Sequence, residues 1–310
     1  MEWRAGTVDA AVEQWGLVRD GDPIVTPSSR LLPVTHRGRP AMLKVPLVHE
    51  EALGGRLLAA WRGIGCAAVF AGDEHSVVLE RAVGGHDLTS LTRAGDDLGA
   101  IAVLGSVLGV LHGALAAPTP TDAGAAPATA APATAAHDAG DVVAELPSLD
   151  EWFRALLFAD ATSLATLTDD PASATFLARG RTLARRLLDD TTRADTVVLH
   201  GDLHHENVLE FAPGDWRAID PKGIVGHRAF DATAMLANPD RSTAQDPRLL
   251  EQRVELLRHS LGVDRSTILA WSVARSALSA VWSLQDGSVE DARDTIEVGL
   301  LAERALGAAR

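Results

Sequence analysis

The chain of 310 residues lacks most of what would stabilise a small secreted domain or build a Cys-rich metal site. It has one cysteine, Cys66, so an internal disulfide framework and a Cys-rich zinc site are excluded. The opening residues MEWRAGTVDA do not resemble a signal peptide, and we expect a cytoplasmic protein. Basic residues are scarce as well, 28 against 42 acidic ones, and the net charge of −14 argues against a nucleic-acid or anionic-membrane surface and favours cationic small molecules.

Long hydrophobic runs are also scarce, with one exception at residues 99–117, GAIAVLGSVLGVLHGALAA. Gly105, Gly109 and Gly113 recur at every fourth position in this run, as in packed membrane helices. The run nevertheless carries His112, lacks basic flanks and has no second span beside it. We expect a central buried helix, with a membrane helix as the alternative.

Strand and helix patterns divide the rest of the chain into two parts. Residues 1–84 are β-rich: PIVTPSSRLLPVT and AMLKVPLV flank the turn HRGRP, HEEALGGRLLAAW has helical spacing, and SVVLERAVGG is a further strand. Residues 85–310 are mainly helical, with SLDEWFRALLFA, TFLARGRTLARRLLDD and RSTILAWSVARSALSAVWSL as helices. The Pro/Ala/Thr tract at 117–140 is a low-complexity surface insertion. The fold class is therefore α+β with two lobes.

The residues most typical of chemistry lie in the stretch VLHGDLHHENVLEF, which begins at Val198. TVVLH is a short strand, GDLHHEN a loop, VLEF and WRAID a hairpin around APGD, so Asp202, Asn207 and Asp220 converge. This set suits phosphoryl transfer. Asp202 orients the attacking hydroxyl and accepts its proton, while Asn207 and Asp220 supply the hard oxygen ligands that Mg²⁺ prefers.

HGDLHHEN resembles the catalytic loop of the protein-kinase-like antibiotic phosphotransferases. The chain is more similar still to the aminoglycoside 6-phosphotransferase and hydroxyurea kinase group, whose segments it matches in order from about residue 20 to 290, the insertion excepted: TPSSRLLPV, PAMLKVP, VVLERAVGG, HGDLHHENVL, WRAIDPKG and SAVWSLQDG. The resemblance implies a bilobal protein-kinase-like fold that binds ATP and Mg²⁺ between its lobes. It also implies streptomycin, phosphorylated at its 6-hydroxyl, as the acceptor, with hydroxyurea or another small metabolite as the alternative.

Lys44 fits this interpretation, because a lysine inside the apolar run AMLKVP needs a carboxylate partner if the strand is buried. Glu51, at the start of the next helix, is the expected partner, and Glu50 the near alternative. Lys44 would then face the α- and β-phosphates. The structural alternative is a lysine that reaches solvent from an edge strand.

The sequence departs from the protein-kinase pattern in three places. No GxGxxG loop is present, so Ser28 and Ser29 of TPSSR would have to cover the phosphates. Glu206 stands where the group is expected to have glycine, and either alters metal affinity or faces solvent. Ten residues separate Asp220 from Asp231, too few for a peptide-binding activation segment, so a small-molecule substrate is favoured. Adenine would be read at the hinge near Glu80 to Ala82.

Candidate acceptor residues are Asp231 and Asp286, whose carboxylates suit guanidinium groups, and Trp282 as a cation-π or apolar wall. Each has a structural alternative: Asp231 anchors the catalytic loop, Trp282 belongs to the core, and Asp286 caps a turn. Lys222 either touches a phosphate or reaches solvent. His200 would fix the loop, with His204 and His205 lining the site.

Two other function classes compete with the kinase. A metal hydrolase would use His200, His204 and His205 with Asp202 as zinc ligands. No HExxH motif is present, however, and Lys44 and Asp220 would have no role. A non-catalytic nucleotide-binding protein would have to retain all the key side chains without using them. The sequence gives no oligomeric state.

Overall fold

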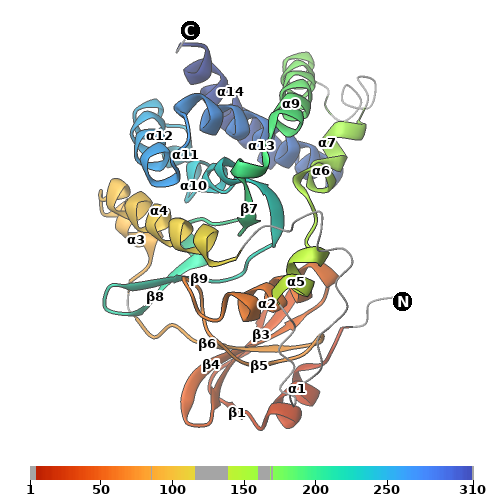
Figure 1. Cartoon of the computed structure of the whole chain (residues 1–310), viewed down its shortest axis with the longest axis vertical. Coiled ribbons are helices and arrows are strands. Elements are labelled where there is room, and N and C mark those ends of the chain that lie inside the picture. The colour runs from red at the N-terminus through yellow and green to blue at the C-terminus, as the bar shows by residue number, and fades with distance from the viewer. Residues whose placement is uncertain (1–4, 85, 116–138, 160–167, 169, 309–310) are drawn as a thin grey trace.

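The computed structural model describes residues 5–84, 86–115, 139–159, 168 and 170–308. Figure 1 shows two lobes, a sheet-containing lobe from the N-terminal part and a larger helical lobe from the rest. The first lobe is an antiparallel sheet of order β1-β3-β4-β6-β5, with β2 paired to β3. Its strands are β1 (Val18–Arg19), β2 (Ile24–Val25), β3 (Ser29–His36), β4 (Arg39–Pro46), β5 (Val69–Gly72) and β6 (Val77–Glu80). Two helices accompany it, α1 (Val8–Trp15) and α2 (His49–Trp61).

The sheet has two differently covered faces, because successive residues of a strand point to opposite sides. Leu43, Val45 and Val78 belong to a small core with residues of α1. Val77 and Leu79, on the other face of β6, join α2 and the second lobe in one large core. The large core therefore connects the two lobes through α2.

β4 is an interior strand, since β3 pairs with one side of it and β6 with the other. Lys44 lies opposite Leu31 of β3 and Val77 of β6. The edge-strand alternative for Lys44 is therefore wrong. The β3–β4 turn has left-handed backbone at Arg37 and Gly38, with φ of 50° and 78°.

The second lobe consists of helices and two small two-stranded sheets. The helices are α3 (Leu88–Arg93), α4 (Asp97–Ala114), α5 (Ala139–Glu145), α6 (Leu149–Trp152), α7 (Arg154–Phe158), α9 (Pro171–Asp190), α10 (Ala232–Leu236), α11 (Arg241–Ala244), α12 (Pro247–Leu261), α13 (Arg265–Gln285) and α14 (Val289–Gly307). One sheet pairs β7 (Thr196–Leu199) with β10 (Ile224–His227), and the other is the hairpin of β8 (Val208–Ala212) and β9 (Asp215–Ala218). In Figure 1, β7, β8 and β9 lie between the N-terminal sheet and the α12–α14 layer.

α4 is the helix that the apolar run predicted. Among the described residues it alone is long and apolar enough to span a membrane. In this structure its buried face packs in the large core, and at its start Asp97 accepts a hydrogen bond from Arg253 Nε of α12 at 2.8 Å. A buried ion pair at one end and His112 near the other tie α4 to neighbouring helices.

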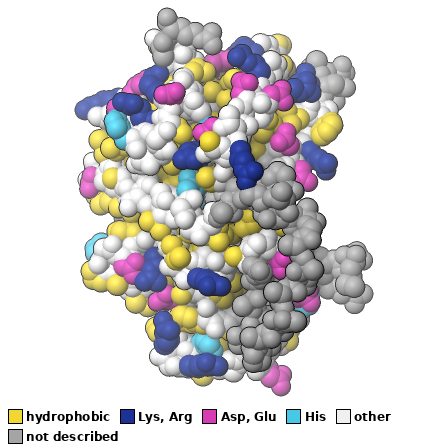
Figure 2. All heavy atoms as spheres, in the orientation of Figure 1, with side chains coloured by type: hydrophobic (Ala, Val, Ile, Leu, Met, Phe, Trp, Pro, Cys, Tyr) yellow, Lys and Arg dark blue, Asp and Glu magenta, His cyan; other side chains and the backbone are white. Residues whose placement is uncertain are grey.

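Some local predictions are corrected. The stretch SLDEWFRALLFA is two short helices, α6 and α7, with the break at Phe153. Residues 139 and 140 of the predicted insertion begin α5, while 116–138 and Gly85 of the hinge lie outside the described residues. The proposed lobe boundary near residue 84 stays a prediction. On the face in Figure 2, acidic and basic side chains are interspersed over both lobes.

Candidate active site between the lobes

A cavity of about 330 Å³ lies between the N-terminal sheet and the β8–β9 hairpin. Its apolar walls come from both lobes: Leu31, Met42, Leu58, Leu79, Leu209, Phe211 and Ile219. The hinge residues Glu80, Arg81 and Ala82 line one part of it, and Lys44, Glu51 and Asp220 line another. An apolar slot that opens on to charged groups suits a nucleotide, with the base against the apolar walls and the phosphates beside Lys44.

Lys44 is 7% exposed and forms ion pairs with Glu51 of α2 and with Asp220 of the second lobe. Glu51 is 4% exposed. Burial alone would raise the pKa of Glu51, but the ammonium groups of Lys44 and Lys222 lower it to about 2. Glu51 is therefore ionised at neutral pH, and the buried lysine has its counter-charge.

Lys222 is also bound to α2: its Nζ lies 2.7 Å from Glu51 Oε1 and 3.4 Å from Glu50 Oε1. Burial would lower the pKa of Lys222, but the hydrogen bond to Glu51 and the surrounding carboxylates raise it above the ordinary value. Glu51 is thus the partner of Lys44, and Glu50 supports Lys222. In this structure Lys222 fixes α2 to the catalytic lobe, which neither sequence alternative anticipated.

Ser28 and Ser29, the residues predicted to cover the phosphates, both line the cavity. Their hydroxyls donate to Glu51, Ser28 Oγ to Oε1 at 3.1 Å and Ser29 Oγ to Oε2 at 3.4 Å. The backbone N–H of Ser29 donates to Thr26 Oγ1 at 2.9 Å. The turn is thereby held at the mouth of the cavity, and a role in phosphate binding stays a prediction.

Asp231 anchors the catalytic loop. It is 1% exposed and accepts hydrogen bonds from the backbone N–H groups of His200 at 2.9 Å and Gly201 at 2.7 Å. His112 Nε2 of α4 lies 2.9 Å from Asp231 Oδ2, the oxygen that also accepts from His200. The expected contact between Asp231 and the acceptor is therefore replaced by the structural alternative, because both carboxylate oxygens are engaged inside the protein.

His200 fixes the loop from the other side, as expected. Its Nε2 lies 2.9 Å from the carbonyl oxygen of Ile219, and its ring stacks on Trp61 with centroids 6.4 Å apart. Burial lowers the pKa of His200, so the neutral ring can donate to Ile219. Ile219, the residue before Asp220, is thereby tied to His200, two residues before Asp202.

Asp202 projects from this loop with its side chain 30% exposed. Arg275 Nη2 of α13 donates to Asp202 Oδ1 at 3.2 Å, and His204 Nε2 lies 3.7 Å from Oδ2. Burial alone would raise the pKa of Asp202, but His204 and Arg275 hold it well below the usual carboxyl range. The carboxylate is ionised at neutral pH and able to accept a proton.

Asn207 and Asp220 offer oxygen atoms to a cation. Asn207 Nδ2 donates to the Asp202 carbonyl oxygen at 2.9 Å, which leaves its Oδ1 without a hydrogen bond to any described residue. The N–H of Ile219 donates to the Asn207 carbonyl oxygen at 2.9 Å, so the two ligand segments are joined. Asp220 has a left-handed backbone with φ of 58°, a conformation that Asp tolerates and that is found at functional sites.

The histidines do not form a zinc site. His205 is fully buried, and burial together with Arg253 lowers its pKa to about 4. It therefore points into the lobe rather than lining the acceptor side, which corrects its predicted role. The described part of the chain holds no group of three His, Cys, Asp or Glu side chains that could bind a metal.

The chain is similar over nearly all its length to kinases that act on antibiotics. The family model for aminoglycoside/hydroxyurea antibiotic resistance kinases matches residues 14–287. A streptomycin 3''-kinase of Klebsiella pneumoniae is 35% identical, covering 89% of this chain and 92% of the relative. A streptomycin 6-kinase of Streptomyces griseus is 31% identical, covering 96% and 89%.

The chain belongs to the aminoglycoside/hydroxyurea antibiotic resistance kinase family. The fold agrees: the crystal structure of an aminoglycoside phosphotransferase, APH(4)-Ia, in complex with ADP and hygromycin B superposes with a TM-score of 0.63 at 16% identity, covering 95% of this chain and 97% of that one. The predicted bilobal protein-kinase-like fold is thereby confirmed, as is the prediction of a small-molecule phosphotransferase that acts on a hydroxyl group.

The two remaining candidates for contact with the acceptor of this kinase lie in the last turn of α13 and at its C-cap. Trp282 is half-buried and packs edge-on against Trp152, with centroids 5.6 Å apart, and Asp286 is exposed at the end of the helix. Arg275, Trp282 and Asp286 follow the i, i+7, i+11 spacing of one helix face. Contacts of Trp282 and Asp286 with an acceptor stay predictions. Sequence reasoning missed Arg275, although this spacing was visible.

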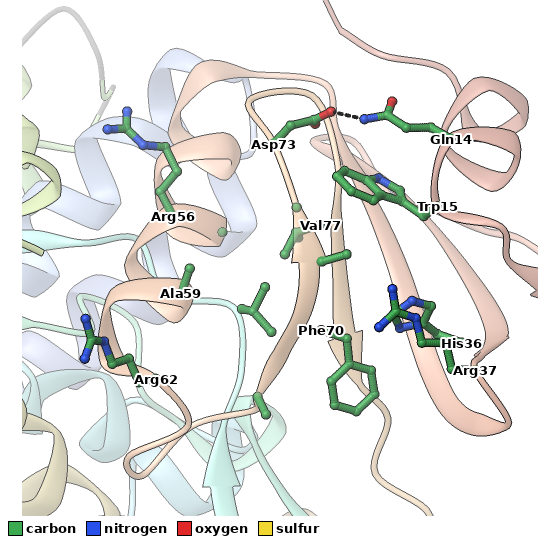
Figure 3. Close-up of a pocket in the computed structure, with 15 residues that line it drawn as sticks. Gln14, Trp15, His36, Arg37, Arg56, Ala59, Arg62, Phe70, Asp73 and Val77 are labelled. Atoms are coloured by element: carbon green, nitrogen blue, oxygen red, sulfur yellow. Dashed lines mark hydrogen bonds between the residues drawn. The ribbon is translucent and has the colours of Figure 1, made fainter. Parts of the chain in front are cut away.

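Another cavity, with a volume of about 700 Å³, lies elsewhere in this kinase, on the N-terminal lobe. Figure 3 shows that Trp15 and Gln14 reach it from α1, and that the guanidinium groups of Arg56 and Arg62 point away from Val77. Its carboxylate, Asp73, accepts a hydrogen bond from Gln14 Nε2 at 2.7 Å. The cavity contains none of the predicted site residues, and the chemistry remains between the lobes.

Proposed function

We propose that this kinase transfers the γ-phosphoryl group of ATP to the 6-hydroxyl of streptomycin, with Mg²⁺ held by Asn207 and Asp220. One observation carries the proposal: Lys44, Glu51 and Asp220, from three separate segments, form one ion-paired group at the cleft, and the Asp202 loop is joined to it through Ile219. This set of side chains matches the parts of a phosphoryl-transfer site.

The residues of the chain have separate tasks in this reaction. Asp202, ionised and half-exposed, orients the acceptor hydroxyl and takes its proton. Lys44, kept in place by Glu51, contacts the α- and β-phosphates. Asn207 Oδ1 and the Asp220 carboxylate suit Mg²⁺, a hard cation that neutralises phosphate charge when bound. The hinge at Glu80 to Ala82 lies where the base would be read by backbone groups.

A cationic acceptor fits a second cavity of about 330 Å³, between α11, α13 and α14. Asp240, Asp291 and Asp294 line it together with Arg275, whose guanidinium contacts Asp202. Carboxylates in the cavity that Arg275 lines suit the guanidinium groups of streptomycin. The related kinases of Klebsiella pneumoniae and Streptomyces griseus are named for different hydroxyls of that antibiotic, so the position is the finer part of the proposal.

A smaller acceptor, hydroxyurea or another hydroxylated metabolite, is the alternative, because the matching family includes hydroxyurea resistance kinases. The two acceptors differ in charge, and the carboxylates around Arg275 favour the cationic one. We also propose that the enzyme acts in the cytoplasm, where ATP is available. Fractionation of cells that produce the chain tests this location.

The test is incubation of the purified chain with ATP, Mg²⁺ and each acceptor, followed by mass spectrometry. We expect streptomycin to gain the mass of one phosphate, and phosphorus–proton correlation in the NMR spectrum to place the group at the 6-oxygen. EDTA should abolish the product and added Mg²⁺ should restore it. Phosphate on hydroxyurea alone would replace the proposed acceptor, and a product formed at full rate in EDTA would remove the magnesium assignment.

A further inference from the structure

Arg275 supplies the positive charge beside the catalytic base. The loop from His200 to Asn207 contains neither lysine nor arginine. Within the described residues, Arg275 of α13 is the only lysine or arginine in contact with the carboxylate of Asp202, although 73 positions separate the two residues. The base therefore depends on a helix of the acceptor side for its permanent counter-charge.

The geometry of this contact is that of an exchangeable pair. Arg275 reaches Asp202 through Nη2 alone at 3.2 Å, and its side chain is 20% exposed. No described residue hydrogen-bonds to its Nε or Nη1. By comparison, Arg253 donates to Asp97 through two nitrogens, at 2.8 Å and 2.5 Å, and both residues are buried. The Arg253–Asp97 pair is structural, whereas the Arg275–Asp202 pair can separate at a small cost in free energy.

Arg275 also lines the acidic cavity between α11, α13 and α14. The carboxylates of this cavity can bind its guanidinium when it leaves Asp202. Asp240 there accepts the N–H of Thr243 as a helix cap, and Asp294 pairs with Arg241 at 2.7 Å. Asp291, in the same cavity, is without a hydrogen bond or ion pair to the described residues. It is a vacant partner for a displaced guanidinium or for a cation on the acceptor.

We propose that Arg275 is a specificity-determining residue: in the resting enzyme its guanidinium holds Asp202, where the acceptor hydroxyl must bind, and a cationic acceptor displaces it. This inference rests on the proposed function. While Arg275 holds Asp202, the base is less available to water. The cationic group of the acceptor binds the carboxylates of the neighbouring cavity and displaces Arg275, and the acceptor hydroxyl then meets a free base.

The reaction that competes with transfer is ATP hydrolysis, and its rate without acceptor is the quantity to measure. Without acceptor, the oxygen of a water molecule attacks the γ-phosphorus, the bond to the β-phosphate oxygen breaks, ADP leaves, and the water proton passes to Asp202. Arg275 suppresses this hydrolysis by engaging the carboxylate. Loss of a residue that only supports the fold would not raise hydrolysis and strengthen acceptor binding together.

The test compares Arg275→Gln and Arg275→Lys with Arg265→Gln, which removes an arginine–glutamate pair at the far end of the same helix. For Arg275→Gln we expect ATP hydrolysis without acceptor to rise about three- to fivefold, the range for a partly exposed ion pair. The KM for streptomycin should fall by a similar factor while kcat changes less than twofold. Arg275→Lys should lie between, Arg265→Gln should match wild type, and thermal melting should show all three folded.

Two results would overturn the inference. A fall of kcat by about a hundredfold in Arg275→Gln without added hydrolysis would mean that Arg275 acts in the transition state. Hydrolysis and KM equal to wild type would mean that the contact has no role. If wild type leaves streptomycin unmodified, the proposed acceptor fails, yet the hydrolysis comparison still decides whether Arg275 restrains Asp202.

Discussion

At the scale of single residues, Glu51 is the central charge of the site. It accepts from Lys44, Lys222, Ser28 and Ser29, and these contacts come from three segments. A buried carboxylate with four donors stabilises the fold and keeps Lys44 in place. The sequence predicted the Lys44 pair from the apolar surroundings of the lysine. It could not predict Lys222 as a second donor, because that contact depends on how α2 meets the other lobe.

The lowered pKa of Glu51 predicts how stability changes with pH. Its folded-state pKa of about 2 lies below the ordinary 4.5, so its contribution is present above pH 4.5 and is lost as the pH falls toward 2. We expect wild type to be more stable than Glu51→Gln at pH 6, and about 2 kcal/mol of that difference to vanish by pH 3, at about 1.4 kcal/mol per pKa unit. Urea unfolding of both proteins at each pH measures it. A difference independent of pH would contradict the pairing.

At the scale of elements, α2 positions the site because it approaches the catalytic lobe closely. Gly54 faces the backbone after Asp220, where a Cβ would lie 2.2 Å from the Pro221 carbonyl oxygen. The missing side chain allows Glu51 to reach Lys222 and Lys44 at once. Gly55, on the next position, faces Val77 with more room, 3.3 Å to Cγ1.

Gly54→Ala should therefore push α2 away from Asp220 and Pro221, the proposed metal-binding segment. We expect a loss of stability of about 1–3 kcal/mol, as for overpacking, and a rise in the KM for ATP. Gly55→Ala is the matched control for stability, since the same change one position on meets a side chain that can yield. Thermal melts and ATP titrations of the two variants measure the effect, and equal behaviour of both would show that the approach of α2 is unimportant.

Elements also show how far sequence reasoning reaches. α2 spans 49–61 as the helical spacing predicted, and β8 and β9 form the expected hairpin. The sequence analysis did not predict α1, β5, β10 and α12. Their short or mixed hydrophobic patterns do not by themselves distinguish a helix or strand from a loop. Asp231 and His205 were assigned to the acceptor for the same reason: their neighbours, His112 of α4 and Arg253 of α12, are distant in sequence.

At the scale of the whole molecule, the lobes are joined by the Lys44–Asp220 ion pair and by the apolar core around α2. A ligand that bridges the cleft binds only when both lobes are in place. Binding to the folded state alone then stabilises the protein by mass action.

We expect a non-hydrolysable ATP analogue with Mg²⁺, at a hundred times its Kd, to stabilise the chain by about 2.7 kcal/mol. Differential scanning fluorimetry should show a clear rise in Tm that EDTA reverses. Asp220→Asn should lose the magnesium-dependent part of the Tm rise, because a neutral amide lacks the negative charge that binds the cation. An identical shift in this variant, or in EDTA, would place the metal elsewhere.

The most direct test of the account is the rate at which phosphate is transferred to streptomycin by wild type and by Asp202→Asn, measured by quenched-flow mass spectrometry under saturating ATP and Mg²⁺. Removal of a general base predicts a fall in kcat of about 10²–10⁴-fold with the protein still folded and still binding nucleotide. Transfer at an undiminished rate by Asp202→Asn would contradict the assignment of the catalytic base and with it the mechanism.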